Sequence, residues 1–223
     1  MHGSTFRASL LLGALLAAGP ASAGLRSPQV AVKGTVLASF FASQNQTIDV
    51  NAAQLDLQTM SADYSTSIPV WSFVDHTATI GFFNAVASLP PLYPVYPGAA
   101  TEGWFSVASF RASPDRLVVN LFDGIGSLMG STTFMGADHE AFSIYVSSTA
   151  ETFYQQDGRN PAGLPRVLVY DGTGPRLGAL WFACETGPGP GGDYADVIFL
   201  VQLVPSPVPV ERSAWGELKR RFR

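Results

Sequence analysis

Short runs of strand-forming residues, each ended by turn residues, constrain this chain more than any other feature of its sequence. The runs are rich in β-branched and aromatic residues, and Gly, Pro, Asp and Asn separate them at the spacing typical of two packed antiparallel sheets. We therefore predict an all-β, jelly-roll-like antiparallel β-sandwich with at most one short helix. The predicted strands cover residues 30–41, 68–74, 79–83, 104–110, 117–122, 141–146, 166–170, 178–184 and 196–203.

Two segments depart from this pattern. Residues 50–61 place Leu55, Leu57 and Met60 among helix-tolerant residues, and we predict the short helix there. Residues 90–97 contain prolines that cannot join a ladder except at a sheet edge, which predicts an extended loop crossing the sandwich surface. In that loop, Tyr93 and Tyr96 either face a ligand or cover the core beneath.

The first 23 residues have the pattern of a secretory signal peptide. A weakly positive start is followed by an apolar stretch and by a small-residue cleavage site that ends at Ala23. The apolar stretch is shorter than the roughly 20 residues that a membrane span needs, so we predict a secreted chain without a transmembrane segment after cleavage. Because Cys184 is the only cysteine, no intrachain disulfide can form, and core packing or a metal must hold the domain together.

The C-terminal end differs from the body in composition and charge. Residues 24–203 are predicted to form one domain, residues 204–210 a Pro-rich extended linker, and residues 211–223 a basic tail. Residues 24–210 carry 7 basic and 15 acidic side chains, whereas residues 211–223 carry 5 and 2. The tail resembles the C-terminal sorting tails of bacterial exported proteins, and an amphipathic helix is the alternative. The net charge of -4 gives no basic surface for a phosphate backbone, which argues against nucleic-acid binding.

The sequence lacks the conventional catalytic motifs. Residues 124–130 resemble a dinucleotide-binding loop, but the third glycine is one position late, and we interpret the segment as a turn. After signal cleavage, two histidines remain, each next to an acid, in the pairs Asp75-His76 and Asp138-His139. Such a pair could orient a general base, although polar turn residues are the simpler interpretation. We expect Cys184 to be a buried apolar residue, because no basic neighbour in sequence lowers the pKa of its thiol.

Three carboxylates lie where two predicted strands meet one loop. Glu185 ends one strand, and Asp193 and Asp196 begin the next. Hairpin geometry brings these ends together, where the carboxylates would repel one another unless a cation or an arginine neutralised them. Calcium suits such a loop outside the cell, so we predict a possible calcium site from Glu185, Asp193 and Asp196, with oxygens from Asp157 and Asn160. The alternative is that the aspartates form turn hydrogen bonds only.

The same region carries a set of turn, glycine and acidic residues, namely Tyr154, Asn160, Pro161, Gly163, Glu185, Gly191, Gly192, Asp193, Tyr194 and Asp196. In this combination it resembles a bacterial exported domain-of-unknown-function family, number 4114, with a Phe-Glu-Asp, Gly-Gly-Asp and Tyr-Asn-Asp core. The resemblance implies an extracellular β-sandwich, often attached to surface or adhesin-like proteins, with a calcium site and no established enzymatic activity. The acidic loop is shorter than in the family, and Thr186 and Ala195 stand where the family has Asp and Asn.

Three functions follow as hypotheses. The first is a secreted or cell-surface, non-enzymatic sandwich with a structural or adhesive role and possible calcium binding, whose partner is an extracellular or cell-surface component such as a glycan. The second is a carbohydrate-binding module that uses aromatic side chains as a sugar platform. The third is a hydrolase that uses one of the two Asp-His pairs. The candidate platform residues are Trp71, Trp104, Tyr93 and Tyr96.

Overall fold

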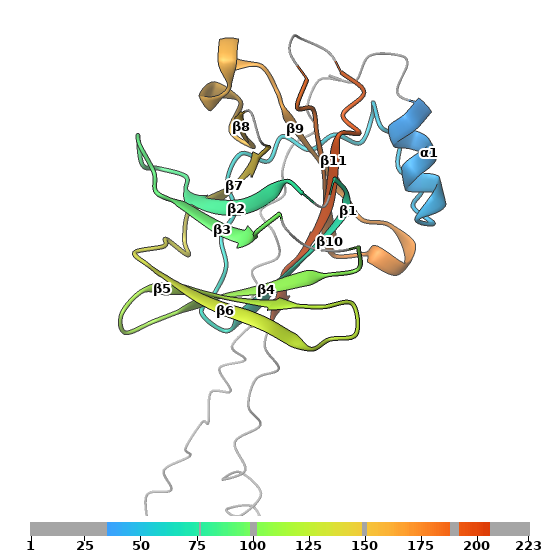
Figure 1. Cartoon of the computed structure of the whole chain (residues 1–223). Coiled ribbons are helices and arrows are strands. Elements are labelled where there is room, and N and C mark those ends of the chain that lie inside the picture. The colour runs from blue at the N-terminus through green and yellow to red at the C-terminus, as the bar shows by residue number, and fades with distance from the viewer. Residues whose placement is uncertain (1–34, 76, 99–101, 149–150, 188–191, 206–223) are drawn as a thin grey trace, which may run out of the picture.

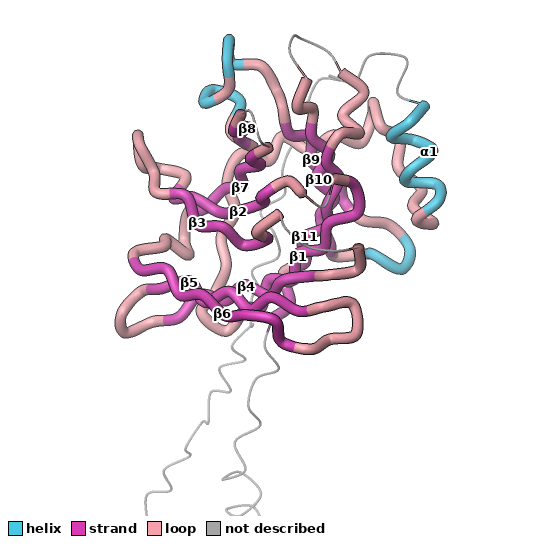
Figure 2. Tube along the Cα trace, viewed as in Figure 1, coloured by secondary structure: helices cyan, strands magenta, loops and turns pink. Residues whose placement is uncertain are grey.

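The computed structural model describes residues 35–75, 77–98, 102–148, 151–187 and 192–205. Its strands form two antiparallel sheets, which Figure 1 labels and Figure 2 shows in magenta. Among the described residues, α1 (Thr35–Ser43) is the one α-helix, and three short 3-10 turns cover Asp157–Arg159, Pro161–Gly163 and Gly174–Arg176. The prediction of an all-β antiparallel sandwich is confirmed. The predicted signal peptide and basic tail lie outside the described residues.

The larger sheet has eight strands in the order β6-β5-β4-β1-β11-β10-β9, and β12 pairs with β1 as well. The first two residues of the predicted Pro-rich linker form β12 and so belong to the sheet. The strand bounds are β1 (Thr66–Val74), β4 (Phe105–Arg111), β5 (Arg116–Phe122), β6 (Leu128–Met135), β9 (Val167–Asp171), β10 (Ala179–Cys184), β11 (Val197–Gln202) and β12 (Val204–Pro205).

The smaller sheet packs on one face of the larger one. Between the sheets lies a core in which Phe82 faces Phe110 and Phe142, while Phe182 stacks on Phe199 with ring centroids 4.9 Å apart. Each fully buried aromatic ring removes a large apolar area from water, which stabilises the sandwich without any disulfide. The order is β3-β2-β7-β8, with bounds β2 (Thr79–Asn84), β3 (Leu92–Tyr96), β7 (Phe142–Ser147) and β8 (Thr152–Tyr154).

A second core lies on the opposite face of β9, β10 and β11, under α1 (Figure 2). The prediction of a strand over residues 30–41 is wrong for residues 35–41, which belong to this helix. Leu37 and Phe41 are four residues apart and both fully buried, so a helix aims both at the sheet, where Phe41 contacts Tyr170 and Trp181.

The helix predicted within residues 50–61 is also wrong. This segment is extended and crosses the open side between the two sheets, because the N–H of Leu55 bonds to the carbonyl of Val169 at 2.8 Å in the larger sheet. Five residues later, Met60 and Phe142 exchange two backbone hydrogen bonds, of 2.7 and 3.0 Å, in the smaller sheet. Tertiary hydrogen bonds have therefore overridden a weak helical propensity.

The proline-rich segment does join a ladder, at an edge as its prolines require. Strand β3 is the outer strand of the smaller sheet, with Pro94 at its centre. Its tyrosines cover the core, since Tyr93 and Tyr96 are 4 % and 0 % exposed, so neither can serve as part of a sugar platform. Strand β6 was not predicted, although the turn before it was: the N–H of Asp123 bonds to the carbonyl of Ser127 at 3.0 Å.

Candidate functional site

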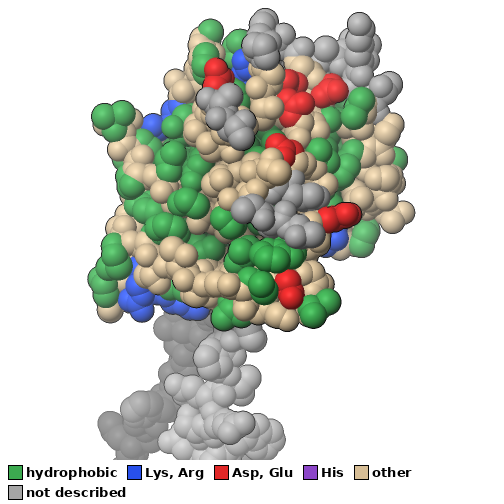
Figure 3. Space-filling view, viewed as in Figure 1, with side chains coloured by type: hydrophobic (Ala, Val, Ile, Leu, Met, Phe, Trp, Pro, Cys, Tyr) green, Lys and Arg blue, Asp and Glu red, His purple; other side chains and the backbone are tan. Residues whose placement is uncertain are grey.

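The predicted metal site lies where β10 and β11 are joined. The Glu185 carboxylate accepts hydrogen bonds from the backbone N–H groups of Gly187, at 2.9 Å, and Tyr194, at 3.4 Å. One oxygen of Asp196 accepts from the N–H and the hydroxyl of Thr186, at 2.7 and 2.9 Å. Glu185 and Asp196 also contact each other. The hairpin therefore brings two of the predicted carboxylates together, and Figure 3 shows acidic side chains gathered at the upper end of the molecule.

The two carboxylates differ in how readily they bind a proton. Burial raises the pKa of Glu185, and the negative charge of Asp196 raises it further. Burial also acts to raise the pKa of Asp196, but the hydrogen bonds that Thr186 donates outweigh it, so this pKa lies below its ordinary value. A cation bound between the two side chains would therefore compete with a proton on Glu185.

The other three predicted ligands point elsewhere. Asp193 accepts a hydrogen bond from the N–H of Ala195 at 3.0 Å, as in the turn interpretation of this loop. Asn160 forms two 2.8 Å hydrogen bonds with the backbone of Tyr154, and Asp157 lies in the 3-10 turn before it. Within the described ranges, no three His, Cys, Asp or Glu side chains lie close enough to hold a metal ion.

The histidine pairs are placed as follows. His76 lies outside the described residues, and its neighbour Asp75 accepts hydrogen bonds from Thr77. The ring of His139 stacks on Tyr64 with centroids 3.9 Å apart, while Asp138 accepts a bond from the N–H of Glu140 at 2.9 Å. In this arrangement Asp138 shapes the turn that contains His139, and its carboxylate bonds to backbone donors.

Cys184 is fully buried, as we predicted. Burial raises the pKa of its thiol well above the ordinary value, and the charge of Asp196 acts in the same direction. The thiol is therefore protonated at neutral pH, which does not suit a nucleophile.

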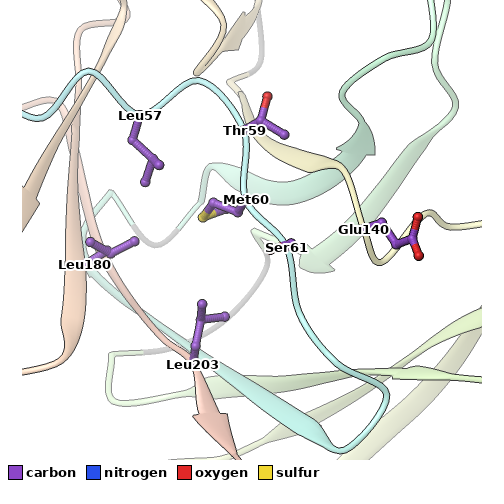
Figure 4. A pocket seen from close by; sticks show the side chains of 7 residues that line it. All are labelled: Leu57, Thr59, Met60, Ser61, Glu140, Leu180 and Leu203. Carbon is purple, nitrogen blue, oxygen red and sulfur yellow. The ribbon is translucent and has the colours of Figure 1, made fainter. Parts of the chain in front are cut away.

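A pocket of about 140 Å³ opens between the extended segment and the end of the larger sheet. Figure 4 shows four apolar side chains pointing toward its centre, while the carboxylate of Glu140 points away. A cavity of roughly this size holds a single small apolar ring at most. The four side chains are Leu57, Met60, Leu180 and Leu203.

The outer face of β1, β4 and β5 carries a row of aromatic rings, which we call the aromatic ridge and define as Trp71, Phe105 and Phe122. The register places Trp71 opposite Phe105 and Phe105 opposite Phe122. Their ring centroids are 6.1 and 5.1 Å apart, and the planes are tilted by 28° and 14°. Leu128 of β6 continues the row and is 59 % exposed. The ridge is thus a partly buried apolar strip on the face of the larger sheet that also carries α1, and at Trp71 it packs against the core under that helix.

The sequence pattern indicated Trp71 but not Phe105 and Phe122 as its neighbours. Each ring sits at an outward position of its own strand, which alternation could have indicated. Their alignment depends on the register of β1 with β4 and of β4 with β5, which the alternation within one strand does not specify.

No protein-family model, curated protein or solved structure matches this chain. The resemblance in residues 152–203 therefore stays a prediction. Among the described residues, no helix has the length and apolar character needed to cross a bilayer.

Proposed function

We propose that this chain is a secreted or cell-surface, non-enzymatic β-sandwich with a structural or adhesive role, and that the aromatic ridge is its adhesive surface. The observation that carries the proposal is the alignment of Trp71, Phe105 and Phe122 on the outer face of the larger sheet, beside the core under α1 against which Trp71 packs. The apolar strip extends to Leu128, whose side chain is mostly in water. Apolar strips rimmed by polar residues are typical of interaction surfaces.

The ring geometry favours an apolar partner over a sugar. A sugar binds by stacking on the open face of a ring, but within the ridge neighbouring rings stack on one another, with centroids 5.1 to 6.1 Å apart. Such stacking leaves fewer ring faces open to a sugar. Trp104 packs against the core between the sheets. The carbohydrate-binding alternative therefore depends on the outer faces of the ridge, above all on Trp71.

Retention of protein-coated beads under flow tests this proposal. Beads carrying the purified chain would be passed over an alkyl-coated surface, a cellulose surface and a hydrophilic surface. We expect retention on the alkyl surface, and a several-fold loss with Phe122→Ser, whereas Asn120→Ser, on the same face of β5, should retain the wild-type level. Equal retention of all three proteins would refute the adhesive role of the ridge. Retention on cellulose that Trp71→Ser abolishes would instead support the carbohydrate-binding alternative.

Calcium binding is a second candidate, favoured by the contact between Glu185 and Asp196. Two carboxylates side by side suit a hard cation. The Gly187 carbonyl already accepts a 2.7 Å hydrogen bond from the Arg166 guanidinium, so any further ligands would be water oxygens. Thermal unfolding in calcium and in chelator tests it, because a ligand at 100 times its Kd stabilises a folded protein by about 2.7 kcal/mol. The same melting temperature in millimolar calcium and in chelator would exclude a functional site.

A further inference from the structure

We propose that strand β6 (Leu128–Met135) is a self-association edge, through which two copies of this chain join their larger sheets into one continuous antiparallel sheet. The inference goes beyond the adhesive role and does not depend on it, because it rests on the backbone edge of β6 and not on the ridge.

Strand β6 is the outermost strand at one side of the larger sheet (Figure 1). It pairs with β5 on one side, in unbroken register from Leu121 opposite Gly130 to Arg116 opposite Met135. No strand of the described part of the chain lies on its other side. Half of its backbone N–H and C=O groups therefore face outward, which is the template that a further strand would need.

The other three sheet edges, β3, β8 and β9, are each protected against pairing with a further strand. Pro94 interrupts β3, and β8 is only three residues long, with Asn160 bonded to the N–H and C=O of Tyr154. At β9, the N–H of Leu55 already occupies the carbonyl of Val169. Natural sandwiches protect their edges with prolines, short strands and covering segments of this kind.

Strand β6 has none of these protections. Its eight residues include no charge and no proline, and seven of the eight are exposed. Large apolar side chains are nevertheless in water there, since Met129 and Met135 are 51 % and 57 % exposed. A long, uncharged, partly apolar edge strand is expected to pair with another strand. We infer that it remains open because pairing is its role.

The composition of β6 fits a second copy of itself. Antiparallel pairing about a two-fold axis at Thr132 places Ser131 opposite Thr133 of the partner, a polar pair that favours adjacent strands. The same register places Phe134 opposite Gly130 of the partner, so an aromatic ring covers a glycine. No charged side chains face one another across the contact. Side chains on one face of β6 in the first copy lie on the same face of the joined sheet as their counterparts in the second copy.

The geometry also sets the strength of the association. An eight-residue strand is about 27 Å long, and a contact of one strand pair buries less than the roughly 800 Å² per partner of a standard interface. We therefore expect a dimer that dissociates on dilution, with a Kd on the order of 10 μM. A two-fold axis perpendicular to the sheet would place both aromatic ridges on the same side, so the dimer would present two adhesive strips.

Sedimentation velocity of the purified full chain, from about 1 to 500 μM, tests the proposal. We expect the wild type to pass from monomer to dimer over this range. Thr133→Lys should raise the Kd at least tenfold, since two lysines would then lie within reach of each other across the axis. Ser127→Lys, in the β5–β6 turn, adds the same charge outside the contact and should dimerise as the wild type does.

Cross-linking fixes the register. In a Cys184→Ala background, Thr132→Cys should form a disulfide with its counterpart under mild oxidation, because residues paired at the axis have Cα atoms about 4.5 to 5.5 Å apart. Ser127→Cys should not. A wild type that stays monomeric at every concentration, or a Thr133→Lys chain that dimerises equally well, would overturn the proposal. A Thr132→Cys chain that fails to cross-link would overturn the assigned register.

Discussion

Gln46 provides a quantitative test of how the chain before β1 is fixed to the larger sheet. Its side chain is 5 % exposed, and its Oε1 accepts hydrogen bonds from the N–H of Thr173, at 2.7 Å, and from the indole N–H of Trp181, at 3.2 Å. Gln46→Met keeps the volume of the side chain but removes this acceptor, which the Thr173 hydroxyl also reaches at 3.5 Å, and the Nε2 donor that bonds to the carbonyl of Gln44 at 3.2 Å. The largest effect comes from the two N–H donors that lose their partner, each at a cost of roughly 1 to 3 kcal/mol.

The cost of leaving the Thr173 N–H without an acceptor is near the lower end of this range, because Thr173 is only partly buried. For the fully buried indole N–H of Trp181 the cost is near the middle of the range. The sum is about 3 kcal/mol, which lowers the Tm of a domain of this size by roughly 6 to 12 °C. Urea unfolding followed by tryptophan fluorescence measures it. Gln44→Met, at a neighbouring partly buried glutamine, should change the free energy of unfolding by less than about 0.5 kcal/mol. A Gln46→Met protein within about 1 kcal/mol of wild type would refute the reasoning.

Three further predictions follow from packing and protonation. Gly81→Ala would drive a Cβ into the ring of Tyr145 and should lower the free energy of unfolding by about 1 to 3 kcal/mol. Gly130→Ala has open space around the new Cβ and should lower it by less than about 1 kcal/mol. Urea unfolding of both variants compares the two values. Folding raises the pKa of Glu185, so the wild type loses stability as pH rises from below about 4.5 through the pKa of the folded state. Glu185→Gln has no charge to lose there, so its melting temperature, measured in chelator, should rise relative to that of the wild type over the same pH range. Parallel pH profiles of the two proteins would contradict this prediction. The Cys184 thiol should react with a disulfide reagent only after unfolding in urea, and rapid labelling of the native protein would show that it is not buried.

Features encoded by local pattern were predicted correctly from the sequence. The contact between Glu185 and Asp196 follows from their places at the two ends of a single hairpin loop, and hairpin geometry is a local property. The restriction of the proline-rich segment to a sheet edge follows from the missing N–H of Pro94, although the segment forms strand β3 there and not the predicted loop. Burial of Cys184 follows from its apolar neighbours in a strand.

Features that depend on distant partners were missed or wrong. Residues 35–41 include β-branched and aromatic side chains, yet they form a helix because Leu37 and Phe41 are buried in one core with Trp181 and Tyr170, well over a hundred residues away. Strand β6 was missed because its glycine, serine and threonines show no apolar alternation. Backbone pairing with β5 makes this segment a strand. The aromatic ridge needed the register of three strands at once.

The central position of β1 has a consequence for the order in which this protein folds. On one side β1 pairs with β4, which follows it closely in sequence, but on the other side it pairs with β11 and β12, the last strands of the described chain. Contacts of such long sequence separation form slowly, because the entropy of closing the long intervening loop is lost before the contacts stabilise the fold. The larger sheet therefore stays divided into two halves until residues 197–205 have been synthesised. A chain that ends before Val197 would expose the unpaired edges of both halves to other strands.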